Sequence, residues 1–357
     1  MRWIGVLCAL ALPSAVLAES PKEKGDKNLS IVAMPIPMSN PALGNGLGVA
    51  ALAIYTPGSS PQPWISGVGG LYTDSKSWAA AIFQKAHLAD DKLRITAGAG
   101  GGDFKLDFYG VGSNAGARNR SIPIDQQSVG ALAEALYRVA PRTYAGVRYR
   151  GAKLKTSFDL SQLPFPDLEL PELELDSQTS ALGLAMEFDS RDNEFAPRKG
   201  VYATAQVLRA AKEIGSDFDY TRLQIAANGY KSLTPKSAIA GRVALCDVGH
   251  GAPFYDLCMF GQNNDLRGYT AGQYRDHFMA AAQVEYRRDL FWRLGAVAFV
   301  GVGGISPSIE KFGSTLLPAA GLGLRLRASK AYGVNASLDF AVGDDSQAFY
   351  FYIGEAF

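Results

Sequence analysis

The sequence predicts an all-β fold, a transmembrane antiparallel up-and-down β-barrel of the outer-membrane type with about 16 strands. Three observations predict it: a leader typical of export, segments in which apolar and polar residues alternate, and longer connections after every second segment. With 39 Gly and 16 Tyr, the composition favours close strand packing and aromatic belts at membrane interfaces. The formal net charge of +1 gives no electrostatic argument for nucleic-acid binding, so no nucleic-acid partner is expected.

The N-terminus has the pattern of a cleavable signal peptide. Arg2 supplies a positive start, residues 3–12 form a short apolar core, and small residues precede a cleavage site after Ala18. A membrane anchor is the alternative, but roughly ten apolar residues are too few for a hydrocarbon core of ~30 Å. Export of a barrel predicts the outer membrane of a Gram-negative bacterium as its location. The expected divisions are a signal peptide, a short periplasmic segment and the barrel: 1–18, 19–28 and 29–357.

Alternation of period two carries the strand prediction, because successive side chains on a strand point to opposite faces. In 277–290, Val284 and Tyr286 share one face, and Glu285 and Arg287 share the other. Segments 180–189, 321–327 and 333–340 follow the same rule, the last with Asp339 on its polar face. A soluble β-sandwich also alternates, but these segments are long for sandwich strands and the leader favours a membrane barrel.

Sixteen segments qualify as strands, and an even count is what a single-chain bacterial barrel requires. They centre on 31–37, 46–55, 64–73, 78–87, 93–101, 127–139, 143–154, 179–188, 201–210, 220–230, 238–245, 278–287, 295–303, 318–327, 333–342 and 348–357.

Connection lengths indicate the orientation of the barrel. If the first strand rises from the periplasm, the long connections 103–124, 159–178, 247–275 and 306–315 lie outside and the short turns face the periplasm. The acidic, Pro-rich stretch 160–175 is expected to be an extended outer loop.

Two cysteines follow the leader, Cys246 and Cys258. The exported compartment is oxidising, and the residues between them have the character of a loop, so a disulfide is expected. The alternative is a pair of buried free thiols.

The C-terminal residues 349–357 alternate aromatic side chains and end in Phe357. This ending, with Phe351 and Gly354, resembles the closing-strand signal of outer-membrane barrels, which the barrel-assembly machinery reads. Physically, such a strand places aromatic rings in the membrane and at its interface. An ordinary apolar terminal strand is the alternative.

Two internal motifs carry a more specific resemblance. The first follows the pattern D-x-R-D-N-x-F-x-P-x-x-G, in which Asn, Pro and Gly supply turn geometry. It comprises Asp189, Arg191, Asp192, Asn193, Phe195, Pro197 and Gly200. The second is Leu266-Arg267-Gly268-Tyr269 in the long connection before 278–287. Together these motifs resemble the bacterial surface antigen superfamily, the barrels of BamA and TamA type, most strongly over 189–357.

The resemblance implies that the long loop folds back into the lumen, where Arg267 pairs with an acidic residue of the wall. Glu285, on the polar face of its strand, is the expected partner. The family usually carries an inward Asp on the next strand, but Gly301 stands at that position, so a looser latch with one carboxylate is expected. A solvated Arg267 at a loop tip is the alternative.

The resemblance further implies a role in protein or lipid translocation, or in outer-membrane protein assembly. The expected partners are outer-membrane lipid, the barrel-assembly machinery during biogenesis, and a protein cargo. Because the sequence shows no run of periplasmic POTRA domains, a passive channel or a surface-exposed structural barrel is the alternative.

Enzymatic readings are weak. The three His residues, His87, His250 and His277, lie in no nucleophile or zinc-ligand pattern. No catalytic residue, metal ligand or cofactor is therefore expected, although His250 lies near Asp247 and Asp256 and leaves an outer-face hydrolase as a minor alternative.

Overall fold

The computed structural model describes residues 29–40, 43–58, 60–118, 120–158, 176–259, 265–329, 332–344 and 346–357. The predicted signal peptide, the segment 19–28 and the acidic stretch 160–175 lie outside these residues. Within the described part of the chain, no helix has the length and apolar character needed to cross a membrane.

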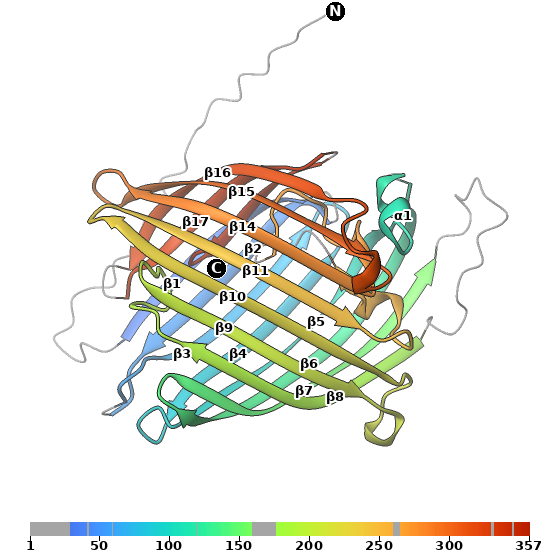
Figure 1. Ribbon diagram of the computed structural model, residues 1–357, viewed down its shortest axis with the longest axis horizontal. Helices are drawn as coiled ribbons and strands as arrows, with labels where there is room; N and C mark the ends of the chain where they lie inside the picture. The colour runs from blue at the N-terminus through green and yellow to red at the C-terminus, as the bar shows by residue number, and fades with distance from the viewer. Residues whose placement is uncertain are drawn as a thin grey trace, which may run out of the picture.

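Sixteen strands form one antiparallel sheet in sequence order, with β12 and β13 set apart as a two-stranded sheet. The 16-strand, up-and-down prediction is confirmed (Figure 1). The strands of the large sheet are β1 (Leu29–Asn40), β2 (Gly44–Tyr55), β3 (Trp64–Thr73), β4 (Trp78–Leu88), β5 (Leu93–Phe108), β6 (Ile122–Ala140), β7 (Thr143–Phe158), β8 (Asp176–Asp189), β9 (Gly200–Ala210), β10 (Tyr220–Thr234), β11 (Ser237–Val248), β14 (Phe278–Asp289), β15 (Leu294–Ser306), β16 (Leu317–Ser329), β17 (Val334–Val342) and β18 (Gln347–Ile353).

The remaining elements lie in the connections. They are α1 (Ser113–Ala117), η3 (Lys212–Ile214), η4 (Phe254–Asp256), β12 (Cys258–Met259), β13 (Arg275–Asp276) and η5 (Ile309–Lys311).

Burial alternates along the strands as a barrel with an apolar exterior requires. On β14, Val284 is exposed whereas Glu285 is completely buried; on β16, Leu324 is exposed and Arg325 is buried. Apolar side chains therefore meet lipid and charged ones meet the lumen. In a soluble protein the apolar side chains are buried and the charged ones are exposed; here the arrangement is reversed, and the sheet closes around a polar interior.

The two ends of the barrel differ in the length of their connections. One end carries short turns, such as 141–142 and 235–236, while α1 and the long connections lie at the other end (Figure 1). Outer-membrane barrels have short periplasmic turns and longer extracellular loops, and the two ends of this sheet show the same contrast.

The first and last strands meet at a seam. The strand order begins with β1 and ends with β18, and within the described residues no ladder pairing joins the two. At the short-turn end the seam is held by other contacts: the hydroxyls of Ser30 and Ser329 lie 3.1 Å apart, and Val32 packs in a cluster with Val334 and Ile353. The sheet is therefore a nearly closed cylinder.

The C-terminal residues correct one prediction. The expected last strand, 348–357, is too long, because β18 ends at Ile353 and Gly354 turns the chain with a φ of +100°. Phe357 is buried in the lumen against Tyr230 and Ala240, and does not reach lipid. Alternation of residues cannot reveal that a chain leaves its sheet, so this part of the prediction was wrong.

Candidate functional site

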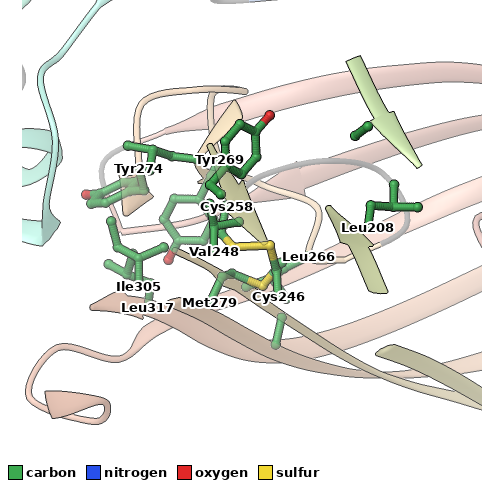
Figure 2. Packing of buried hydrophobic residues seen from close by; sticks show 14 of the residues in the cluster. Leu208, Cys246, Val248, Cys258, Leu266, Tyr269, Tyr274, Met279, Ile305 and Leu317 are labelled. Atoms are coloured by element: carbon green, nitrogen blue, oxygen red, sulfur yellow. A yellow bond between two sulfur atoms is a disulfide. The ribbon is translucent and has the colours of Figure 1, made fainter. Parts of the chain in front are cut away.

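The loop between β11 and β14 packs against the inner faces of β14 to β18. Its residues Leu266, Arg267 and Tyr269 are all buried. Leu266 and Tyr269 belong to an apolar cluster with side chains of β11, β14, β15 and β16 (Figure 2). The described part of this loop is therefore an internal structure of the barrel.

Arg267 is completely enclosed, with 0% of its surface exposed. Its Nη2 donates to Oε2 of Glu285 at 2.6 Å, its Nη1 donates to Asp339, and its Nε donates to Oε1 of Gln283 at 3.3 Å. The guanidinium carbon also lies 3.4 Å from the ring centroid of Phe299. A planar guanidinium can use several donors at once, so this geometry fixes the loop in one position.

The expectation of a single carboxylate was wrong. Gly301 does stand on the strand after Glu285, but the second carboxylate comes from Asp339 on β17. Gly301 serves another purpose, because a Cβ there would lie 2.4 Å from Cδ1 of Leu266 and 2.6 Å from the carbonyl oxygen of Ala282. The missing side chain makes room for the loop, and the latch is held from both sides.

Further charges surround the Arg267 contacts. Arg287 donates to Oε1 of Glu285 at 2.6 Å, and Arg325 donates to Asp339 at 2.5 Å and to Glu355 at 2.7 Å. Each buried charge thus faces opposite charges, which is the condition under which ion pairs survive burial. The three guanidinium groups and three carboxylates belong to Arg267, Arg287, Arg325, Glu285, Asp339 and Glu355. We call this set the latch network.

Gly268 and Tyr269 dock the next part of the loop. Gly268 has a φ of +119°, and a Cβ there would lie 2.9 Å from the backbone of Val342. Its N–H donates to the hydroxyl of Tyr350 at 2.9 Å. The hydroxyl of Tyr269 donates to the carbonyl of Pro318. Glycine at position 268 therefore permits the positive φ and the close approach to Val342, and the long side chain of Tyr269 reaches the carbonyl of Pro318.

Cys246 of β11 and Cys258 of β12 form a disulfide with a Cα–Cα distance of 5.8 Å. Figure 2 shows it beside Val248 and Met279, within the same apolar cluster as Leu266. The bond ties the start of the loop to the barrel wall, so the loop is held at two places.

The turn motif between β8 and β9 folds inward at the short-turn end. The ring of Phe195 packs in the cluster that contains Val32, Ile54 and Val334, from both sides of the seam. Glu194 pairs with Lys85 of β4. Although burial raises the pKa of the Glu194 carboxyl, the neighbouring ammonium group of Lys85 outweighs it and holds that pKa below its ordinary value.

The other residues of this motif stabilise the turn itself. Arg191 Nη2 donates to Asp189 Oδ2 at 2.7 Å, and Asp192 Oδ1 accepts from the N–H of Arg198 at 2.9 Å. Asn193 Oδ1 accepts from the N–H of Phe195 at 2.9 Å, and the carbonyl of Pro197 accepts from Arg287 at 3.3 Å. Gly200 has a φ of +103°, and a Cβ there would lie 2.2 Å from the carbonyl oxygen of Ser190. The sequence indicated a turn, and the structure adds that the turn reaches into the lumen.

The terminal aromatic residues divide between the two faces of β18. Tyr350 and Tyr352 point inward, where Tyr352 donates to Asp339 at 2.5 Å. Phe351 lies between them in sequence and so belongs to the outer face. The sequence analysis did not name Tyr350 and Tyr352 as site residues. The alternation along 349–353 nevertheless puts both on the same face of the strand, the face that lines the lumen.

Sequence reasoning also missed Gln283, Arg325 and Asp339 as members of the site. The alternation in 277–290, 321–327 and 333–340 puts these three residues on the polar faces of their strands, but it does not say which polar residues meet the loop. The three His residues do not form one site: the rings of His250 and His277 lie with centroids 4.6 Å apart and an interplanar angle of 52°, while His87 binds Asp91 at the short-turn end. Among the described residues, no group of three or more His, Cys, Asp or Glu side chains is placed to hold a metal ion.

Three solved structures are similar to this fold. BamA from Haemophilus ducreyi lacking POTRA domains 1–3 matches with a TM-score of 0.55 and 15% identity, over 92% of this chain and 70% of that chain. CdiB from Acinetobacter baumannii matches with a TM-score of 0.59 and 11% identity, and CdiB from Escherichia coli with 0.61 and 10%. This chain spans 60% and 63% of the two CdiB chains, and 92% of it is covered in each case.

These structures share the fold at low identity. A search of curated proteins finds no match to the sequence. A scan against protein families matches the Omp85 superfamily domain over residues 92–357, most of the chain. The resemblance drawn from the two internal motifs is thereby confirmed, and the chain belongs to the Omp85 superfamily.

Proposed function

We propose that this protein is an outer-membrane barrel that translocates or inserts polypeptide, or lipid, with its internal loop as the latch. The observation that carries the proposal is the enclosure of Arg267 between Glu285 and Asp339. The loop contributes one buried charge, Arg267, and the strands of the wall contribute two, Glu285 and Asp339. Burying charges is costly unless each is paired, so this pairing holds the loop inside the lumen.

The seam supports the same function. β1 and β18 lie at the two ends of the sheet without a ladder between them in the described residues, and β18 carries Tyr350, which binds the loop at Gly268. Because Tyr350 of β18 binds the loop, movement of the loop can change the position of β18 at the seam, and movement of β18 can release the loop. The proposed action needs no catalytic residue, and we assign none.

The remaining parts of the proposal concern location and partners. We place the chain in the outer membrane, with residues 1–18 as a cleaved signal peptide, 19–28 as a periplasmic segment and 29–357 as the barrel. Its partners are outer-membrane lipid, the barrel-assembly machinery during its own biogenesis, and a protein cargo. The terminal Phe351, Gly354 and Phe357 provide the signal that this machinery reads.

Insertion of an unfolded model barrel into liposomes tests the proposal. Liposomes that contain the wild-type protein should fold the precursor faster than protein-free liposomes, and Arg267→Ala should lose most of that acceleration. Arg209→Ala is the matched control, because Arg209 is an exposed arginine paired at 3.6 Å with Asp219 far from the latch. Absence of any acceleration by the wild type contradicts the proposal.

A passive channel is the second candidate, and the small inward residues at mid-height on β3 to β5, such as Gly69, Ala81 and Gly100, favour it. Single-channel recordings separate the two. A steady, large conductance that Arg267→Ala leaves unchanged indicates an open pore. A low conductance that rises when Arg267 is replaced indicates a lumen closed by the latch.

A further inference from the structure

A cavity of about 270 Å³ opens at the short-turn end of the barrel. Its walls come from the β8–β9 turn at Pro197, the β14–β15 turn at Trp292, the start of β17 at Asn335, and Glu355. Three members of the latch network, Arg287, Arg325 and Glu355, also line it. Parts of the chain that are distant in sequence therefore build one concave site.

The cavity is strongly basic. Six arginines line it against two carboxylates, those of Asp289 and Glu355. The arginines are Arg198, Arg287, Arg288, Arg293, Arg325 and Arg327. The whole chain has a formal net charge of only +1, so positive charge is concentrated here.

The carboxylates of the cavity are already shared. Asp289 accepts from Arg198 at 2.7 Å and lies 3.9 Å from Arg327. Glu355 accepts from Arg325 at 2.7 Å and also lies 3.9 Å from Arg287. Arg287 and Arg325 also pair with Glu285 and Asp339 of the latch network, so four carboxylates in all face the six arginines of the cavity. The remaining positive charge of the walls attracts an anion. Guanidinium groups are well matched to phosphate, which accepts several donors at once.

The rim adds an apolar component. Trp292 lines the cavity and is 76% exposed, and the adjacent Phe291 is 69% exposed. Trp side chains concentrate at the boundary between membrane and water. An aromatic rim beside a basic cavity suits a ligand that is both anionic and amphiphilic.

We propose that this cavity binds the phosphodiester headgroup of an anionic phospholipid from the periplasmic leaflet. The arginines hold the phosphate and Trp292 lies against the glycerol and acyl region. Lipid bound here contacts both the β8–β9 turn and the β14–β15 turn, next to the latch network. The site shares Arg287, Arg325 and Glu355 with the latch network, and lipid binding there does not depend on whether the protein translocates cargo.

Lipid binding by the purified full-length protein tests the inference. Native mass spectrometry in detergent micelles should show phosphatidylglycerol bound in preference to phosphatidylcholine. Arg198→Gln combined with Arg327→Gln should weaken phosphatidylglycerol binding at least tenfold, whereas Arg209→Gln should leave it within twofold. Heat-modifiable migration confirms that each variant is folded. If the double variant does not fold, Arg288→Gln, which breaks no ion pair described above, should weaken binding at least threefold.

A soluble competitor distinguishes the source of the phosphate. Glycerol 3-phosphate should compete at least tenfold more weakly than phosphatidylglycerol, and Trp292→Ala should weaken the lipid without changing the competitor. The lipid assignment is overturned by equal competition from glycerol 3-phosphate, which indicates a site for a soluble phosphate. The site itself is overturned if phosphatidylcholine binds as well as phosphatidylglycerol, or if the arginine variants bind like the wild type.

Discussion

Two walls of the same lumen differ in chemistry. On the wall made by β14 to β17, the inward side chains at mid-height include the polar or charged Gln283, Glu285 and Asp339. On the opposite part, β3 to β5, Lys85 marks the inner face because it reaches Glu194 in the lumen. At mid-height, six of the residues that share this face by pairing and alternation are small: Gly67, Gly69, Ala79, Ala81, Gly98 and Gly100. Phe83 is the aromatic exception among them, and its ring lies over Gly67.

The contrast shows what decides where the internal loop docks. A buried guanidinium requires carboxylates and further acceptors, and only the charged wall supplies them. The small residues at mid-height on β3 to β5 offer no carboxylate and little side chain for the loop to pack against. Two regions with the same strand geometry therefore play different parts because of their inward residues.

The largest effect is expected from Arg267→Ala, which tests whether the charged wall of β14 to β17 holds the loop. This change removes one member of a fully buried charge network and leaves Glu285 and Asp339 with fewer partners. A loss of stability of about 3–5 kcal/mol is expected for the docked loop. The temperature at which the heat-modifiable band converts to the unfolded form measures it. Arg209→Ala should change that temperature little, and an equal effect of both variants would count against the latch.

Removal of the disulfide through Cys246→Ala with Cys258→Ala comes next. The bond closes a short loop, with a sequence separation of 12. Cross-links of this size are worth about 3 kcal/mol. The same thermal assay should show a lower conversion temperature, while limited proteolysis should cut the loop between β11 and β14 faster. A loop that stays as resistant as in the wild type would show that Arg267 alone holds it.

Gly301→Ala tests whether the loop requires the absence of a side chain at position 301, where the resemblance would place an Asp. A Cβ there collides with Leu266, so a destabilisation of about 1–3 kcal/mol from overpacking is expected. Gly301→Asp should be at least as harmful, although the resemblance would place Asp at this position. If Gly301→Asp instead raises the conversion temperature, the loop can move to accept a third carboxylate, and the packing argument fails.

The smallest effect is expected on the opposite wall. Ala81→Ser adds one hydroxyl to an exposed inward position of β4. The change in stability should be below about 0.5 kcal/mol, with unchanged conductance. A large change in either quantity would mean that this wall holds something, and the comparison would need revision.

Much of the site could be predicted from local pattern. Period-two alternation separates Val284 from Glu285 whatever lies around them, because a strand has only two faces. The Leu266–Tyr269 stretch resembles a family motif, and that resemblance implies both the inward fold of the loop and the pairing of Arg267. Asp339 was on a polar face in the sequence, yet nothing local linked it to a residue 72 positions earlier.

The amino-acid sequence by itself determined the strands, their faces, the turns and the barrel class, since these depend on neighbours a few residues apart. Only the tertiary structure decided that Asp339 completes the latch, that Gly301 makes room for Leu266, and that the chain turns inward after Gly354. Those features depend on which positions of distant strands lie at the same height once the sheet has closed. Strand register around a cylinder sets that height, and alternation alone does not contain it.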